Sequence, residues 1–77
     1  MVDLLFFAEL QESVGKEKIS VEAAGMTVQE LKNTYLRKYD IQNTENVMVA
    51  INEEYVTDNS ILVDGDVVAF IPPVSGG

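Results

Sequence analysis

The sequence predicts a single α+β domain, with about five strands in one mixed sheet and one main helix. Three observations support this prediction. The 77 residues are enough for one domain of ordinary size. Runs of apolar, β-branched and aromatic residues lie near both ends of the chain, whereas helical spacing occurs in only one central segment. Hydrophobic residues make up 47% of the chain, which is enough for one packed core.

The strongest strand signals are two apolar runs close to the ends of the chain. Residues 2–8 (VDLLFFA) are short, apolar and aromatic-rich, which predicts a mostly buried strand. Residues 67–71 (VVAFI) predict a last strand that is buried on both faces, as a central strand is. Because these runs are the most apolar, we expect them to lie together at the centre of the sheet.

Weaker strand signals occupy the sequence between these two runs. Residues 16–23 alternate between apolar and polar, which predicts a half-exposed strand that forms a hairpin with the first strand. Residues 47–51 (VMVAI) predict a third strand, in which Met48 fills the core. Residues 52–54 then turn the chain into a short fourth strand at residues 55–56.

The main helix is predicted over residues 27–39. Thr27 followed by Glu30 has the capping-box pattern, in which each side chain binds the backbone N–H at the other position. The apolar side chains that follow at helical spacing are Val28, Leu31, Tyr35, Leu36 and Tyr39. We interpret the two tyrosines as core packing. One helix covering one sheet face, in a β-β-α-β-β-β order, predicts a two-layer fold of the β-grasp kind.

Composition excludes several classes of function. The chain has no cysteine and no histidine, which removes disulfides, thiolate nucleophiles, zinc fingers and histidine general bases. The net charge of −8 disfavours binding to the phosphates of nucleic acids and favours a basic protein surface as the partner. Residues 39–77 contain acidic residues but no lysine or arginine, so this preference concentrates in the C-terminal half.

No targeting or membrane segment is visible. The first ten residues contain Asp3 and Glu9 and no basic segment, unlike a secretory signal peptide. No apolar run approaches the roughly 18 residues that a membrane-spanning helix needs. We therefore expect a cytoplasmic protein that does not associate with membranes.

The side chains show no complete active site. No GxGxxG or P-loop pattern occurs, and the serines have no histidine partner. The acidic pairs Glu53-Glu54 and Asp64 with Asp66 are each bounded by turn residues. We interpret both pairs as solvated turns rather than acid–base or magnesium sites, and we expect no metal.

The last six residues, PPVSGG, provide the remaining chemical group. Gly76 and Gly77 have no Cβ, so their backbone can enter a channel too narrow for other residues. The two prolines favour an extended exit from the last strand, and six residues reach about 20 Å at roughly 3.3 Å each. We therefore divide the chain into a domain at residues 1–71 and a flexible tail at residues 72–77 that delivers a C-terminal acyl group.

These features resemble a known family. The tail after VVAFI and the opening LLFFAELQESVG resemble the small subunits of molybdopterin synthase. These are ubiquitin-like sulfur carriers, related to the sulfur carrier of thiamine biosynthesis. The most specific evidence is the joint occurrence of Asp64-Gly65-Asp66, Pro72-Pro73 and Gly76-Gly77 at the expected spacing. The resemblance covers essentially the whole chain, although residues 40–60 match only in general character.

The resemblance implies a sulfur-transfer activity shared with partner proteins. An ATP-dependent activating enzyme adenylates the Gly77 carboxylate, and sulfur transfer then makes this residue a 1-thioglycine thiocarboxylate. In the large subunit of the synthase, this sulfur attacks cyclic pyranopterin monophosphate, and two successive transfers build the dithiolene. The chain itself binds no cofactor, and acid–base groups come from the large subunit. We expect a heterotetramer of two large and two small subunits.

The resemblance also assigns roles within the tail. Gly77 carries the reactive acyl group, and Gly76 provides clearance for the extended backbone. The residues expected to line the partner's channel are Pro72, Pro73, Val74 and Ser75.

An apolar sheet face is the expected docking surface for both partners. Asp3 marks the solvent-facing side of the first strand, which puts Leu5 and Phe7 on that face, with Ala69 and Ile71 as neighbours on the last strand. An exposed apolar group there is typical of a binding site. The alternative is that the helix covers this face.

Three other functions are compatible with the sequence. The first is a sulfur carrier for thiamine synthesis or another pathway, although the FFA opening and the PPV before the glycines favour the pterin pathway. The second is a ubiquitin-like protein modifier, joined through Gly77 to target lysines. The third is an interaction module with an inert tail, which would tolerate deletion of Gly77.

Overall fold

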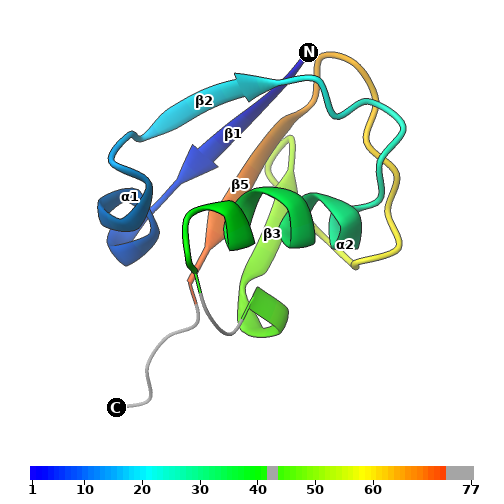
Figure 1. Ribbon diagram of the computed structural model, residues 1–77. Helices are drawn as coiled ribbons and strands as arrows, with labels where there is room; N and C mark the ends of the chain where they lie inside the picture. The colour runs from blue at the N-terminus through cyan, green and yellow to red at the C-terminus, as the bar shows by residue number, and fades with distance from the viewer. Residues whose placement is uncertain (42–43, 73–77) are drawn as a thin grey trace.

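A computed structural model describes residues 1–41 and 44–72 and has two layers, a mixed sheet and a helix across one of its faces (Figure 1). The sheet has five strands in the order β2-β1-β5-β3-β4. The strands are β1 (Val2–Phe6), β2 (Lys18–Val21), β3 (Met48–Ile51), β4 (Glu54–Val56) and β5 (Val67–Ile71). Each of the five lies within or next to a segment that the sequence predicts as a strand.

The first and last strands lie side by side at the centre of the sheet. They run parallel, with Leu5 opposite Ala69 and Phe6 opposite Phe70. β2 pairs with β1 and β3 pairs with β5, both antiparallel, and β4 continues antiparallel from β3. The β-grasp prediction and the central pairing of the terminal strands are both confirmed.

The main helix begins at the predicted capping box. The Thr27 hydroxyl accepts a hydrogen bond from the Glu30 backbone N–H, and the Glu30 carboxylate accepts one from the Thr27 backbone N–H. Helix α2 (Val28–Leu31) continues directly into a wider π-helical segment, η1 (Lys32–Leu36). Helical geometry extends to residue 38, close to the predicted end at residue 39.

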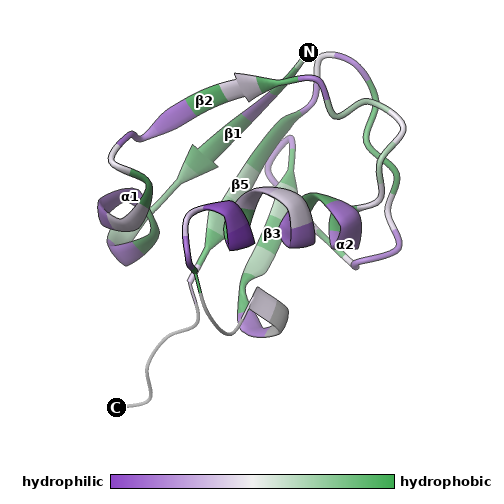
Figure 2. Cartoon of the chain, in the orientation of Figure 1, coloured by the Kyte–Doolittle hydropathy of each residue, from purple (hydrophilic) through white to green (hydrophobic). Residues whose placement is uncertain are grey.

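The core lies between the sheet and this helix. Phe6 and Phe70 stack on neighbouring strands, with ring centroids 5.6 Å apart and an interplanar angle of 20°. Leu31 and Leu36 from the helix are fully buried. Tyr39 contacts the edge of Phe6, at a centroid distance of 6.4 Å, which agrees with its predicted packing role. Apolar residues dominate the central strands (Figure 2).

The connection within the predicted β1–β2 hairpin contains a short helix. β1 ends at Phe6, and the extended backbone ends one residue later, because Ala8 has a positive φ of 51°. Helix α1 (Ala8–Val14) follows and ends at Gly15, whose φ of 84° is the left-handed conformation that favours glycine. The strands flanking this helix still pair antiparallel, as predicted.

The segment after β4 is attached to the start of α2. The Val28 N–H donates to the Ser60 carbonyl at 2.9 Å, and the Gln29 N–H donates to the Asp58 carbonyl at 3.0 Å. These contacts satisfy backbone donors that the first turn of a helix leaves without partners. A short 3₁₀ turn, η2 (Thr44–Asn46), precedes β3.

Within the described part of the chain, no helix has both the length and the apolar character needed to cross a membrane.

Candidate functional site: the outer face of the sheet

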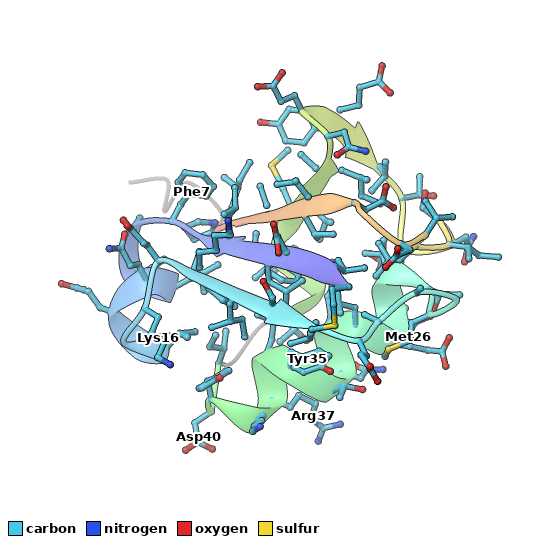
Figure 3. The ribbon with its side chains drawn as sticks, turned by 90° about the horizontal axis from the view of Figure 1, so that it is seen from above. Phe7, Lys16, Met26, Tyr35, Arg37 and Asp40 are labelled. Carbon is cyan, nitrogen blue, oxygen red and sulfur yellow. The ribbon has the colours of Figure 1, made fainter. Side chains whose placement is uncertain are left out.

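The sheet face that points away from α2, here called the outer face, is exposed to solvent. Figure 3 shows Phe7 on the side of the sheet opposite the helix that carries Tyr35 and Arg37. Phe7 is 47% exposed, and Leu5 and Ala69 beside it are half-buried. The alternative in which the helix covers this face is therefore wrong.

Strand β5 is central but is not buried on both faces. Val68 and Phe70 point into the core and are fully buried. The alternate residues of the strand face outward: Val67 is exposed, and Ala69 and Ile71 are half-buried. The prediction of burial on both faces is wrong because, among the described residues, the helical layer of α2 and η1 covers the inner face and leaves the outer face exposed.

Strand pairing extends this apolar surface across the sheet. Leu5, Ala69, Ala50 and Tyr55 form one row, because each lies opposite the next on the neighbouring strand. Tyr55, at the end of the row, is 65% exposed. The row joins four of the five strands, with Ala50 buried at 6% exposed between Ala69 and Tyr55.

A second row contains Ile71 and, opposite it, Met48. Met48 is 47% exposed, so its predicted role as core filler is wrong. Its neighbour Val49 points inward and is buried, and side chains alternate along a strand. Met48, Tyr55 and Val67 also lie on this face and were not predicted there, although the alternation of side chains along β5 indicates it for Val67.

A shallow groove runs along the outer face. Its lining residues are Leu5, Phe7, Asn52, Glu53, Val67 and Ala69. Phe7 follows the last residue of β1, at the end of the sheet where β5 finishes, and Asn52 lies beside the first residue of β5. The groove therefore extends from the end of the sheet that leads to the C-terminus to the β3–β4 turn.

The far end of the groove is held by hydrogen bonds around Asn52. The Asn52 N–H donates to the Val67 carbonyl at 2.8 Å, and the Val67 N–H donates to Asn52 Oδ1 at 3.1 Å. Asn52 Nδ2 donates to Asp66 Oδ1 at 3.1 Å, and the Val63 N–H donates to Asp66 Oδ2 at 2.9 Å. Asp66 thus joins the β3–β4 turn to the turn that precedes β5.

The two aspartates of the Asp64-Gly65-Asp66 turn have different environments. Asp66 is only 8% exposed, so its interpretation as a solvated carboxylate is wrong. Its carboxylate tolerates burial because it accepts hydrogen bonds from two segments. Asp64 is exposed and pairs with the N-terminal ammonium group of Met1. The predicted tight turn is confirmed, with Gly65 at a φ of 91°.

A polar network borders the outer face on the β2 side. The Ser20 hydroxyl donates to Asp3 Oδ1 at 2.6 Å, and Lys18 Nζ lies 3.5 Å from Asp3 Oδ2. The hydrogen bond from Ser20 lowers the pKa of the Asp3 carboxyl, with a smaller effect from the charge on Lys18. The charges at this margin are therefore paired within the chain.

The outer face lies at the base of the predicted tail. Strand β5 ends at Ile71, and Pro72 follows it, half-buried. The predicted tail residues Pro73, Val74, Ser75, Gly76 and Gly77 lie outside the described residues. Leu5, Phe7, Ala69 and Ile71 do lie on one face, as predicted, and their role in docking stays a prediction.

The described residues hold no cluster of three or more acidic, histidine or cysteine side chains that could bind a metal ion. The outer face, an apolar groove with one polar end, has the character of a protein-binding surface rather than a catalytic pocket.

Known sequences resemble this chain over nearly its whole length. The ThiS family model matches residues 4–77. A molybdopterin synthase sulfur carrier subunit from Escherichia coli is 36% identical over 81 aligned positions, covering 100% of both chains. One from Arabidopsis thaliana is 33% identical and covers 99% of this chain and 82% of the relative.

Solved structures with the same fold carry related names. A putative molybdopterin converting factor subunit 1 from Pyrococcus furiosus has a TM-score of 0.80 at 27% identity, covering 95% of this chain and 97% of that one. A complex of subunits 1 and 2 of molybdopterin-converting factor from Helicobacter pylori contains a chain with a TM-score of 0.68 at 26% identity, with 99% and 97% coverage.

A further structure of this kind is small archaeal modifier protein 1 from Methanosarcina acetivorans. Its TM-score is 0.71 at 26% identity, with coverage of 99% of this chain and 95% of that one. The family match spans nearly the whole chain, and the relatives align over their full length or most of it. This chain therefore belongs to the ThiS family.

Proposed function

We propose that this chain is the sulfur carrier subunit of molybdopterin synthase and that Gly77 carries the sulfur. The observation that carries the proposal is the full-length similarity to proteins named as this subunit. The chemistry of the chain agrees with it. The chain has no cysteine and therefore no thiol that could carry sulfur as a persulfide, which agrees with a carrier that holds sulfur at its C-terminal carboxylate.

Charging of the carrier requires two steps on an ATP-dependent activating enzyme, an adenylyl transfer followed by an acyl transfer. An oxygen of the Gly77 carboxylate attacks the α-phosphorus of ATP, and pyrophosphate leaves to give an acyl-adenylate. A hydrosulfide equivalent from a sulfur donor then attacks the carbonyl carbon, and AMP leaves. The product is a thiocarboxylate, whose sulfur is a better nucleophile than the original carboxylate oxygen.

Discharge of the carrier takes place in the large subunit. The thiocarboxylate sulfur attacks a side-chain carbon of cyclic pyranopterin monophosphate, and an oxygen substituent leaves that carbon. Water then hydrolyses the bond between the acyl carbon and sulfur, which returns Gly77 to a carboxylate and leaves a thiol on the pterin. A second charged carrier repeats the transfer on the adjacent carbon and completes the dithiolene.

Each subunit therefore supplies a different part of the enzyme. This chain supplies the sulfur, and the large subunit supplies the substrate pocket and the acid–base groups. We expect Gly76 and residues 72–75 to occupy a narrow channel leading to that pocket. The complex of subunits 1 and 2 from Helicobacter pylori supports a large-subunit partner. We propose a heterotetramer of two large and two small subunits, located in the cytoplasm.

The outer face is the surface we assign to the large subunit. Its exposed apolar side chains include Phe7, Met48 and Tyr55, and it includes Ile71, the residue that precedes the tail. A partner bound there would hold the domain while the tail extends into its channel. The activating enzyme needs the same tail, so we expect it to use the same face at a different time.

Intact mass spectrometry tests this function directly. The purified chain is incubated with ATP, the activating enzyme and a sulfide donor, and its C-terminal fragment is sequenced. We expect exchange of one oxygen for sulfur on Gly77, and no such exchange in a variant that lacks Gly77. Fragmentation is needed because methionine oxidation changes the total mass by almost the same amount. An unmodified Gly77 under these conditions would contradict the proposal.

The similarity to small archaeal modifier protein 1 favours a second candidate function, covalent attachment to other proteins. Here a lysine amine, rather than hydrosulfide, attacks the activated Gly77 carbonyl and forms an isopeptide bond. Peptide mapping of cell extracts would reveal remnants of the tail on target lysines. A reconstituted synthase that makes molybdopterin from charged carrier supports the first function; adducts without pterin product support the second.

A further inference from the structure

Glu53 has a backbone conformation that is unfavourable for its side chain. Asn52 and Glu53 are the two central residues of the β3–β4 turn, with φ values of 51° and 74°. A type I′ hairpin turn needs positive φ at both positions, and glycine is the preferred residue at the second. Asparagine tolerates this region through its short polar side chain, but glutamate has no such advantage. A glutamate at this position is a reason to look for a function of its side chain.

The carboxylate of Glu53 contributes no polar contact to the fold within the described residues. Asn52, next to it, makes the hydrogen bonds that hold the turn to β5 and to Asp66. Among residues 1–41 and 44–72, Glu53 makes no side-chain hydrogen bond or ion pair. The turn geometry therefore depends on Asn52, and the charge of Glu53 is available to a partner.

The negative charge of Glu53 lies at the edge of the proposed docking surface. Glu53 lines the groove of the outer face together with Leu5, Val67 and Ala69. Phe7 lies toward the other end, about four residues along the strands, which corresponds to roughly 13 Å at about 3.3 Å per residue. A partner that covers the groove would bury apolar atoms near Phe7 and meet a negative charge at the β3–β4 turn.

We propose that Glu53 is a specificity-determining contact that binds a lysine or arginine side chain of the large subunit. This inference rests on the proposed function, because it names a contact made by the same docked partner. The net charge of the chain, −8, favours a partner surface that is positively charged. Since Glu53 lies far from the tail end of the groove, its contact strengthens docking without touching the reacting atoms.

Three substitutions separate charge from backbone strain. Glu53→Gln removes the charge and keeps the shape, Glu53→Lys reverses the charge, and Glu53→Gly also relieves the left-handed conformation. Glu54→Gln is the matched control. It removes a neighbouring exposed carboxylate. In the strand pairing, Glu54 lies opposite Ile51, outside the outer-face row. The affinity of each variant for the purified large subunit is measured at low and moderate salt.

We expect Glu53→Gln to weaken binding roughly three- to tenfold and to reduce its salt dependence. Glu53→Gly should lose the same affinity although its thermal midpoint rises, and Glu53→Lys should lose more. Glu54→Gln should stay within about twofold of the unmodified chain. In the reconstituted reaction, Glu53→Gln should raise KM for the charged carrier and leave kcat unchanged.

A charge swap completes the test. Glutamate substituted for the contacting cation of the large subunit should restore binding to Glu53→Lys and weaken binding to the unmodified chain. If Glu53→Gln and Glu54→Gln bind alike with the same salt dependence, the inference is overturned while the proposed function stands. If the unmodified chain does not bind the large subunit at all, the proposed function fails as well.

Discussion

Asn52 and Asp66 are 14 positions apart in the sequence, yet Asn52 Nδ2 donates a hydrogen bond to Asp66 Oδ1 at 3.1 Å. The other carboxylate oxygen accepts from the Val63 N–H at 2.9 Å. Through these two bonds, one nearly buried side chain holds the turn that precedes β5 against the turn that ends the groove. The shape of the outer face at this end therefore depends on Asp66.

Replacement of Asp66 by alanine should destabilise the domain. The substitution leaves the Val63 N–H and the Asn52 amide without their acceptor, which costs about 1–3 kcal/mol in free energy of unfolding. Urea denaturation followed by circular dichroism measures this loss. Asp64→Ala is the control, because Asp64 belongs to the same turn but is exposed. Equal effects of the two substitutions would contradict the assigned role of Asp66.

Replacement of Phe7 by glutamate should weaken binding to the large subunit by about tenfold or more, because a charge would enter an apolar contact. The free domain should keep its thermal midpoint, since Phe7 is already half exposed. Isothermal titration calorimetry gives the affinity. Ile61→Glu serves as a control at an exposed apolar residue that bridges to Thr27 at the start of the helical layer. Normal folding with unchanged affinity would rule out the outer face as the docking surface.

Replacement of Ser20 by alanine should raise the pKa of Asp3 toward the ordinary aspartate value, because the Ser20 hydroxyl is the main cause of its lowering. Because the pKa of Asp3 is lowered by folding, its ionised carboxylate stabilises the folded state at pH values above the ordinary carboxyl pKa. That contribution is lost as the pH falls through the lowered pKa of the folded state. An NMR titration of the Asp3 carboxyl carbon measures the change. An unchanged Asp3 midpoint in Ser20→Ala would show that the hydrogen bond is not its cause.

Lys32 and Asp58 allow a test of how the helix is attached to the loop after β4. Lys32 Nζ lies 3.0 Å from Asp58 Oδ1, and the Lys32 side chain is only 6% exposed. Lys32→Ala removes this partner and the packed aliphatic stem, and we expect a loss of about 1–3 kcal/mol in free energy of unfolding. Lys32→Met keeps the stem and should lose less.

Lys38→Ala is the matched control for this series, because Lys38 is exposed on the same helix. Its unfolding free energy should stay within about 0.5 kcal/mol of the unmodified chain. The ion pair would have no structural role if Lys32→Ala were equally mild in the same denaturation experiment.

The sequence alone predicts the elements that are determined by residues close together in the chain. The Thr27 and Glu30 capping box begins the helix where expected, because both partners lie within one turn. Residues 67–71 form the last strand with the predicted bounds, because their β-branched and aromatic side chains favour extended backbone. The alternation around Asp3 correctly placed Leu5 and Phe7 on one face.

The tertiary structure alone decided which surfaces are covered. Alternation defines two faces of a strand, but it does not tell which face helix α2 covers. This is why Met48 and the outer side of β5 were assigned to the core. Asp66 looks like a solvated turn residue until its partner Asn52 is brought to it across 14 positions. Chain composition and the terminal glycines pointed to an acyl carrier, whereas the groove that joins Phe7 to Glu53 exists only because β1, β5 and the β3–β4 turn meet in space.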